Sequence, residues 1–236
     1  MLELQSLSGM RFLDVGNGSG LSSLSALNLG AEVTSFDYDQ ESVKATKQLK
    51  EMFASDSNIW SIEVGSVLDR QYMQSLGKGD IVYSWGVLHH TGRMWNAIDN
   101  CIEVVEDNGV LFIAIYNDQG LRLHIWWILK YIYNIMPAIL KKPYALTFGM
   151  FVKLLLAVKN LFKLPVKEVL KPFRDYKSYR GMSMTHDLID WYGGFPYESA
   201  TYETLIDYIE AKNFKLINGK ANRSSGCHEL VFKKYT

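Results

Sequence analysis

Short apolar runs alternate with amphipathic stretches along the first 118 residues of this chain. Runs rich in Val, Ile and Phe and bounded by Gly, Asp or Asn are typical of buried strands, whereas apolar residues at helical spacing among charges are typical of surface helices. The predicted strands cover 12–15, 32–39, 60–66, 81–88 and 109–116, and the predicted helices include 40–53 and 94–106. This rhythm predicts an α/β fold with a doubly wound, mostly parallel sheet.

The C-terminal stretch returns to the same pattern after a long interruption. A helix is predicted over 201–212, followed by strands over 214–219 and 228–234 with a turn between them. A minimal core of this kind does not need the intervening residues. We therefore predict a single domain spanning 1–236 that carries 119–200 as a helical insertion or lid.

Residues 121–140 and 145–163 of the insertion are nearly all apolar, with polar residues on one narrow helical stripe of each segment. The first stripe consists of Arg122, Lys130, Asn134 and Lys141. Pro137 and Pro143 are predicted to separate the two helices. Neither segment predicts a transmembrane span, because charge recurs along both. A wide apolar face beside a basic stripe favours a helix that lies on an anionic membrane or covers a hydrophobic substrate; a lid packed on the core or on a second subunit is the alternative.

The formal net charge of zero hides an asymmetry. Residues 121–180 carry twelve Lys and Arg against two acidic residues, whereas the rest of the chain carries 13 against 23. Nucleic acid is disfavoured as a partner, because the basic residues alternate with bulky aliphatics and no recognition motif accompanies them. Cys101 and Cys227 lie outside any metal-ligand spacing, and the N-terminus shows no signal peptide. We predict a reduced, cytoplasmic protein without a metal site.

Residues 11–20, RFLDVGNGSG, place a glycine turn between the first strand and the first helix. Such a turn lets a ligand approach the backbone where the helix N-terminus offers unpaired N–H groups. The dinucleotide fingerprint G-x-G-x-x-G requires glycine at position 21, where Leu21 stands instead. Asp14 places a carboxylate at the end of the strand, where it would repel a pyrophosphate and attract a cationic ligand.

With Asp14 before its glycines, this stretch resembles the first motif, D-x-G-x-G-x-G, of the class I S-adenosylmethionine-dependent methyltransferases. The resemblance covers 11–118 and 201–234. It implies a Rossmann-like, seven-stranded methyltransferase fold and S-adenosyl-L-methionine as cofactor, with S-adenosyl-L-homocysteine as product. The implied cofactor contacts are Asp14, Gly16, Asn17, Gly18, Gly20, Asp37, Tyr38, Ser66, Val67, Ser84, Trp85 and Gly86, with Asp37 on the ribose. At position 66 the family often has an acid, whereas this chain has Ser66.

Three further stretches, GVLHHTG, IAIYNDQG and RGMS-x-x-HD-x-x-DW-x-GG-x-P-x-E, resemble a bacterial subgroup related to the ubiquinone-biosynthesis O-methyltransferases. A hydroxyl acceptor needs a base, and histidine suits that role near neutral pH. The catalytic candidates are His89, His90 and Asp118, which follow the fourth and fifth strands, and His186 from the insertion; His90 or His186 is the predicted base. A structural role is the alternative for each histidine. The predicted substrate contacts are Tyr116, Asn117, Arg180, Asp187, Trp191 and Tyr197, because the dense segment 180–198, taken as a loop, favours a binding site over packing.

The sequence therefore predicts in-line methyl transfer to an oxygen of a small or lipid-linked, anionic acceptor. RNA (tRNA) methylation and a catalytically inactive cofactor-binding scaffold are the alternatives. No Asn-Pro-Pro-Tyr stretch follows the fourth strand, which argues against the amino-group methylases of nucleobases and glutamine. A homodimer and peripheral contact with an anionic membrane through 121–163 are further expectations.

Overall fold

The computed structural model describes residues 5–161, 184–223 and 226–235. The chain divides into two compact units. The first, here the sheet unit, comprises Met1–Gln119 and Glu198–Thr236, and the second, the helical unit, comprises Gly120–Tyr197. The division therefore falls within three residues of each end of the segment 119–200.

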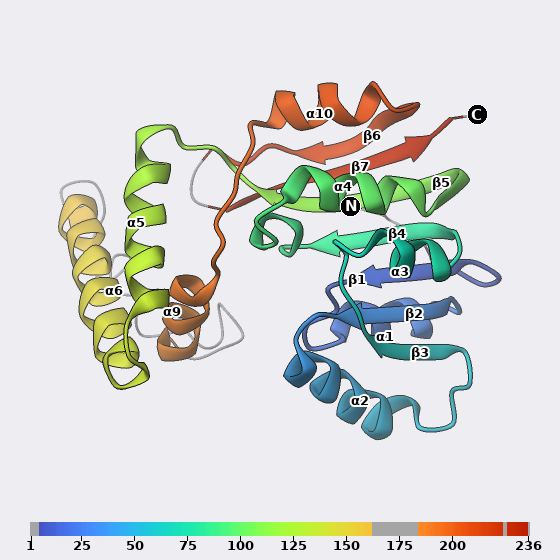
Figure 1. The fold of residues 1–236 in the computed structure, drawn as a ribbon, viewed down its shortest axis with the longest axis horizontal. Coiled ribbons are helices and arrows are strands. Elements are labelled where there is room, and N and C mark those ends of the chain that lie inside the picture. Colours follow the sequence, from blue (N-terminus) through green and yellow to red (C-terminus); the bar gives the residue numbers. More distant parts are fainter. Residues whose placement is uncertain (1–4, 162–183, 224–225, 236) are drawn as a thin grey trace. The chain divides into compact units, whose positions relative to one another are not determined.

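A seven-stranded sheet with the order β3-β2-β1-β4-β5-β7-β6 forms the centre of the sheet unit (Figure 1). Neighbours among β1 to β5 pair in parallel, whereas β7 runs antiparallel to both β5 and β6. The strands are β1 Arg11–Val15, β2 Glu32–Asp37, β3 Trp60–Val64, β4 Gly79–Trp85, β5 Val105–Tyr116, β6 Phe214–Lys220 and β7 Cys227–Lys234. The predicted doubly wound, mostly parallel sheet with an antiparallel edge is confirmed.

Helices cover both faces of this sheet. They are α1 Leu21–Asn28, α2 Gln40–Ala54, α3 Arg70–Ser75, the short 3-10 helix η1 Leu88–His90, α4 Met94–Glu103 and α10 Tyr202–Glu210. One apolar cluster joins the sheet to α4 and α10 through residues such as Ile98 and Leu205. A second cluster joins the opposite face to α1 around Ala26, Val33 and Trp60. Burial on both faces explains why the strands are continuous apolar runs rather than alternating ones.

The boundary between α4 and β5 differs from the prediction. The helix expected over 94–106 ends at Glu103, and β5 begins at Val105 rather than at residue 109. Val105 is fully buried and pairs with Gly79 across the sheet. Strand pairing in the folded protein therefore places in β5 residues that the sequence pattern assigned to the preceding helix.

The helical unit contains α5 Leu121–Ile135, α6 Ala138–Leu161 and α9 Met184–Gly193. Tyr133, Ala145 and Tyr192 form its buried centre, with one residue from each helix. Close approach is needed here, because a Cβ built at Gly149 would lie 2.5 Å from a methyl group of Leu188. In the described parts of the chain, no helix has both the length and the apolar character needed to cross a bilayer.

Two expectations for this segment are wrong. Pro143 lies inside α6 rather than between two helices. It is the sixth helical residue, so its missing N–H and its ring disturb only the bonding next to the first turn. The segment 180–198 is also not simply a loop, since 184–193 is helical. Leu188 and Tyr192 are buried one turn apart on the same face of α9.

Candidate functional site

The predicted glycine turn links β1 to α1. Gly16, Gly18 and Gly20 have φ values of +78°, +51° and +80°, which favour glycine. A Cβ at Gly16 would lie 2.5 Å from Val87, and one at Gly20 would lie 2.6 Å from Thr46. Nothing lies within 4 Å of a Cβ built at Gly18. The outer glycines therefore permit packing, whereas the central one presents backbone to open space.

Hydrogen bonds hold this turn against the neighbouring elements. The Gly18 N–H donates to Oδ2 of Asp37 (3.0 Å), and the Thr46 hydroxyl donates to the Gly18 carbonyl (3.1 Å). The second carboxylate oxygen of Asp37 accepts the Asp39 N–H at 3.0 Å. Each oxygen of Asp37 keeps acceptor capacity beyond these bonds. The predicted ribose residue is thus fixed beside the open glycine.

Asp14 lies within β1 rather than at an exposed strand tip. It is 1% exposed, and the Ser23 hydroxyl from α1 donates to its carboxylate at 2.5 Å. Burial, partly offset by the Ser23 bond and reinforced by the charge of Asp37, raises the pKa of Asp14 to about 7. A cation that approaches the glycine turn would stabilise the charged form of the Asp14 carboxyl group.

Asn17 supplies a second buried polar group next to the glycines. It is 7% exposed, and neither its Oδ1 nor its Nδ2 has a hydrogen-bond partner among the residues that the structure describes. Such groups cost free energy unless a ligand or water completes their bonds. The sequence has no Lys or Arg between residues 12 and 43. The carboxylates of Asp14 and Asp37 beside this turn further disfavour a ligand with phosphate groups.

The loops after β3 and β4 reach the same edge. The Gly65 N–H donates to the Asp37 carbonyl, which brings Ser66 and the buried Val67 next to β2. The Ser66 hydroxyl accepts the Leu68 N–H within its own loop. The other predicted cofactor residues differ in their exposure. Ser84 is buried and its hydroxyl donates to the Val15 carbonyl, whereas Trp85 and Tyr38 are 50% and 81% exposed. Gly86 directly precedes Val87, the residue that covers Gly16.

An aromatic cluster follows β4 and β5, where the sequence places the candidate base. The His89 ring lies 3.9 Å from that of Tyr116 and 4.4 Å from that of His90, centre to centre. His89 is fully buried, whereas His90 is partly exposed and Asp118 is exposed. Of the two adjacent imidazoles, His90 is therefore the one that a ligand can reach.

A strap of residues 198–200 crosses this edge and was missed as a site element. The Glu198 N–H donates to the His89 carbonyl (3.0 Å), and its carboxylate accepts the Met94 N–H at the start of α4 (3.0 and 3.2 Å). Ala200 donates to the Tyr116 carbonyl and accepts from Asp118. Asn117 forms a parallel bridge with Ala200. The strap therefore joins η1, α4 and the end of β5. Its only sequence signal was Glu198, the last residue of the motif in 180–198.

Residues 13–111 match the family described as a methyltransferase domain. These residues are a methyltransferase domain. Its curated relatives include ubiquinone biosynthesis O-methyltransferases of Glaesserella parasuis, 30% identical over 111 residues that make up 47% of each chain, and of Xanthomonas oryzae pv. oryzae, 34% identical over 112 residues (47% of this chain, 45% of the relative). The chain thus spans about half the length of the curated relatives it matches.

Solved structures show the same fold. Magnesium protoporphyrin IX methyltransferase from Synechocystis PCC 6803, solved with bound SAH, is 15% identical with a TM-score of 0.57, covering 97% of this chain and 75% of that one. PKMT2 from Rickettsia typhi, in complex with AdoHcy, is 12% identical with a TM-score of 0.65, covering 97% of this chain and 49% of that one. At these identities the likeness concerns the fold of the methyltransferase domain.

Other predicted site residues belong to the helical unit rather than to the methyltransferase domain. The rings of Trp191 and Tyr197 contact the fully buried Lys130, whose ammonium lies 4.9 and 4.8 Å from their respective centres. Lys130 also donates to the Trp191 and Gly194 carbonyls at the end of α9, and burial lowers its pKa to about 8. Packing therefore accounts for part of the aromatic density in 180–198. Arg180 and the side chains of His186 and Asp187 lie outside the described residues.

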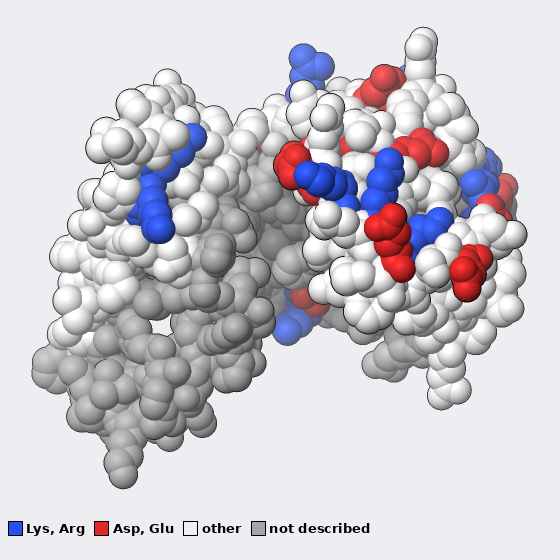
Figure 2. Space-filling model, turned by 90° about the horizontal axis from the view of Figure 1, so that it is seen from below, with Lys and Arg blue, Asp and Glu red and all other residues white. Residues whose placement is uncertain are grey.

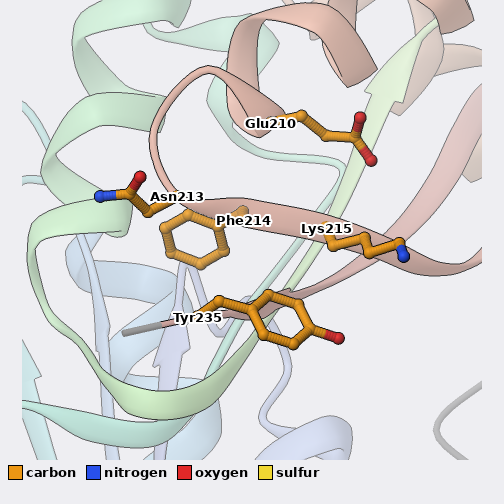
Figure 3. A pocket seen from close by; sticks show the side chains of 5 residues that line it. All are labelled: Glu210, Asn213, Phe214, Lys215 and Tyr235. Carbon is orange, nitrogen blue, oxygen red and sulfur yellow. The ribbon is translucent and has the colours of Figure 1, made fainter.

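A shallow hollow lies elsewhere, at the outer edge of the sheet where α10 turns into β6 (Figure 3). Its walls come from Glu210, Asn213, Phe214, Lys215 and Tyr235. The Glu210 carboxylate is already used by the Leu216 N–H. This lining shares no residue with the glycine turn or the histidine cluster, so the hollow is separate from the site of the methyltransferase domain.

Proposed function

We propose that this chain uses S-adenosyl-L-methionine to methylate an oxygen atom of a small or lipid-linked acceptor. The observation that carries this proposal is the open backbone at Gly18, placed beside the Asp37 carboxylate and next to the buried Asp14. The free thiols of Cys101 and Cys227 support a reducing compartment such as the cytoplasm.

The residues at the glycine turn fit the proposed cofactor. S-adenosylmethionine carries an ammonium and a sulfonium and no phosphate, so the two carboxylates of Asp14 and Asp37 favour it over a dinucleotide. Asp37 would accept hydrogen bonds from ribose hydroxyls. The buried side-chain amide of Asn17 would form hydrogen bonds with the bound molecule. Asp14 would stabilise the positive charge from within β1.

The acceptor would lie at the histidine cluster. When bound, the cofactor would supply an electrophilic methyl group that an oxygen nucleophile attacks in line, with S-adenosylhomocysteine as the leaving group. His90 would take the proton from that oxygen, because its ring is accessible where that of His89 is not. The buried His89 and the partly exposed Tyr116 would hold the His90 ring in place through edge-on ring contacts. The relatives named as ubiquinone biosynthesis O-methyltransferases support oxygen as the acceptor atom.

Calorimetric titration with S-adenosylhomocysteine tests the cofactor assignment. We expect micromolar binding to the wild type and a loss of at least about tenfold in Asp37→Ala, because two hydrogen-bond acceptors leave the ribose site. Asp39→Ala is the matched control, since the Asp39 carboxylate faces the first turn of α2 and caps Glu41 and Ser42 instead. That control should bind almost as tightly as the wild type.

A second variant guards against misfolding of Asp37→Ala, which leaves the Gly18 and Asp39 N–H groups without their acceptor. Gly18→Ala adds one methyl group to open space and should weaken binding while circular dichroism stays native. Equal affinity of the wild type and both folded variants would contradict the assigned site. Absence of binding to the wild type would contradict the proposed function itself.

A further inference from the structure

The polarity of α5 is reversed relative to that of a helix on a soluble protein. Its polar residues Lys130 and Asn134 face α9, where Lys130 is fully buried and Asn134 donates to the Lys130 and Tyr192 carbonyls. The predicted polar stripe therefore lies at least partly inside the helical unit rather than in solvent. Both groups satisfy their hydrogen bonds there, so the apolar side of α5 is left facing outward.

The outward side of α5 carries a row of isoleucines. Ile125, Ile128, Ile132 and Ile135 recur at helical spacing opposite Lys130 and are 60%, 51%, 38% and 64% exposed. At one margin of this row Trp127 stacks on Tyr131 at 5.2 Å, and both rings are about 40% exposed (42% and 41%). Paired amphipathic aromatics at the edge of an apolar face are typical of helices at a membrane interface.

The neighbouring helix α6 has the same character. Phe151, Leu154, Leu155 and Val158 are 56%, 62%, 54% and 45% exposed, on the side opposite the buried Ala145 and Gly149. In Figure 1, α5 and α6 run side by side within the helical unit. We call these two exposed rows the outer face. Contiguous apolar surface of this kind marks an interaction site on a folded protein.

Charge indicates what covers the outer face. Between residues 119 and 167 the sequence has eight Lys and Arg, of which Lys130 is buried, and no Asp or Glu. Lys142 is exposed, and Lys141 lies 5.5 Å from the ring of Tyr133 near the start of α6. Figure 2 shows basic side chains within a largely uncharged surface on the described part of the helical unit in view. A second copy of this chain would bring like charges together, whereas an anionic bilayer would pair with them.

We propose that the outer face of α5 and α6 docks on the surface of an anionic lipid bilayer. The isoleucine and leucine rows enter the boundary between headgroups and acyl chains, and basic residues of the helical unit such as the exposed Lys142 contact lipid phosphates. Docking needs neither cofactor nor acceptor, so this proposal is independent of the proposed methyl transfer. A lipid-linked acceptor would be one consequence of it.

Cosedimentation of the full chain with vesicles tests the docking. Vesicles of phosphatidylcholine with about one-third phosphatidylglycerol should bind at least about tenfold more protein than phosphatidylcholine alone, and high salt should reduce the difference. Leu154→Glu places a carboxylate in the outer face and should lower binding about tenfold or more. Met52→Glu, at an equally exposed apolar position of α2 (67%), is the matched control and should bind like the wild type.

Three outcomes would overturn the proposal. The first is equal binding of wild type and Leu154→Glu to the anionic vesicles, or none by either. The second is a dimer of the wild type in light scattering that Leu154→Glu dissociates, without vesicle binding, which would assign the face to a second copy. The third is a melting temperature of Leu154→Glu lowered by far more than that of Met52→Glu, which would show that the face is buried inside the protein.

Discussion

Asp14 has a structural cost at a position where we propose that the cofactor binds. Its carboxyl is buried under α1 with one bond from Ser23, and its pKa rises to about 7 from an ordinary value near 4. The folded state thus holds a proton that the unfolded state has released over this interval. Its contribution to stability is complete below about pH 4 and is lost as the pH rises through 7.

We therefore predict that Asp14→Asn removes this pH dependence from the cofactor-free protein. Urea unfolding at pH 5 and pH 8 should show the variant gaining on the wild type by about 2–4 kcal/mol at the higher pH, because the buried charge is absent. Asp56→Asn, on an exposed turn after α2, should parallel the wild type. Parallel curves for Asp14→Asn would mean that the carboxyl group is charged and solvated at neutral pH.

At the scale of elements, the strap 198–200 connects the histidine segment to the end of β5. Glu198 is its anchor, because its carboxylate accepts the first N–H of α4, whose N-cap Arg93 makes no side-chain bond. We predict that Glu198→Ala costs about 1 kcal/mol of stability and speeds hydrogen exchange at the Met94 amide. Glu198→Gln keeps the acceptor and should restore most of the protection.

The Glu198 variants can also be tested by their effect on His90, the candidate base. If the strap holds η1, Glu198→Ala should broaden or shift the His90 side-chain resonances, while Glu203→Ala in the first turn of α10 should leave them unchanged. Unaltered exchange at Met94 in Glu198→Ala would show that the contact contributes nothing to the helix start.

The elements of the sheet unit could be predicted because their signals are local. The glycine turn, the Asp37 position and the apolar runs of β1, β4 and β5 each specify one structure without help from distant residues. The carboxyl-edge placement of His89, His90 and Asp118 followed from parallel strands alone. Whether any of these residues touches a cofactor or substrate stays a prediction.

The elements of the helical unit depended on packing that no local pattern reveals. The stripe with Lys130 was predicted to lie beside a face that contacts a membrane or a substrate, yet Lys130 is enclosed by Trp191, Tyr197 and two carbonyls. Pro143 predicted a break, but α6 tolerates it near its start. The aromatic residues of 180–198 predicted a binding loop, although Trp191 and Tyr192 pack α9 onto α5. Periodicity tells which residues share a helix face but not whether that face meets protein, water or lipid.

At the scale of the whole molecule, we expect the sheet unit to fold and to bind the cofactor without the helical unit. Among the described residues, the contacts of the glycine turn lie in the sheet unit, and the chain leaves and re-enters that unit beside one bridge, between Asn117 and Ala200. We predict that replacing 120–197 by a flexible Gly-Ser linker of about eight residues leaves a folded protein. It should unfold cooperatively and bind S-adenosylhomocysteine within about threefold of the full chain, because no residue proposed for the cofactor is removed.

The shortened protein also separates the roles of the two units. Calorimetry and vesicle cosedimentation on the same sample should show retained cofactor binding with lost membrane binding, since the outer face leaves with α5 and α6. Loss of the cooperative transition would mean that the sheet unit needs the helical unit to fold. A folded protein that has lost cofactor affinity would mean instead that the helical unit completes the cofactor site, and the cofactor contacts would then have to be sought in 120–197 as well as at Gly18 and Asp37.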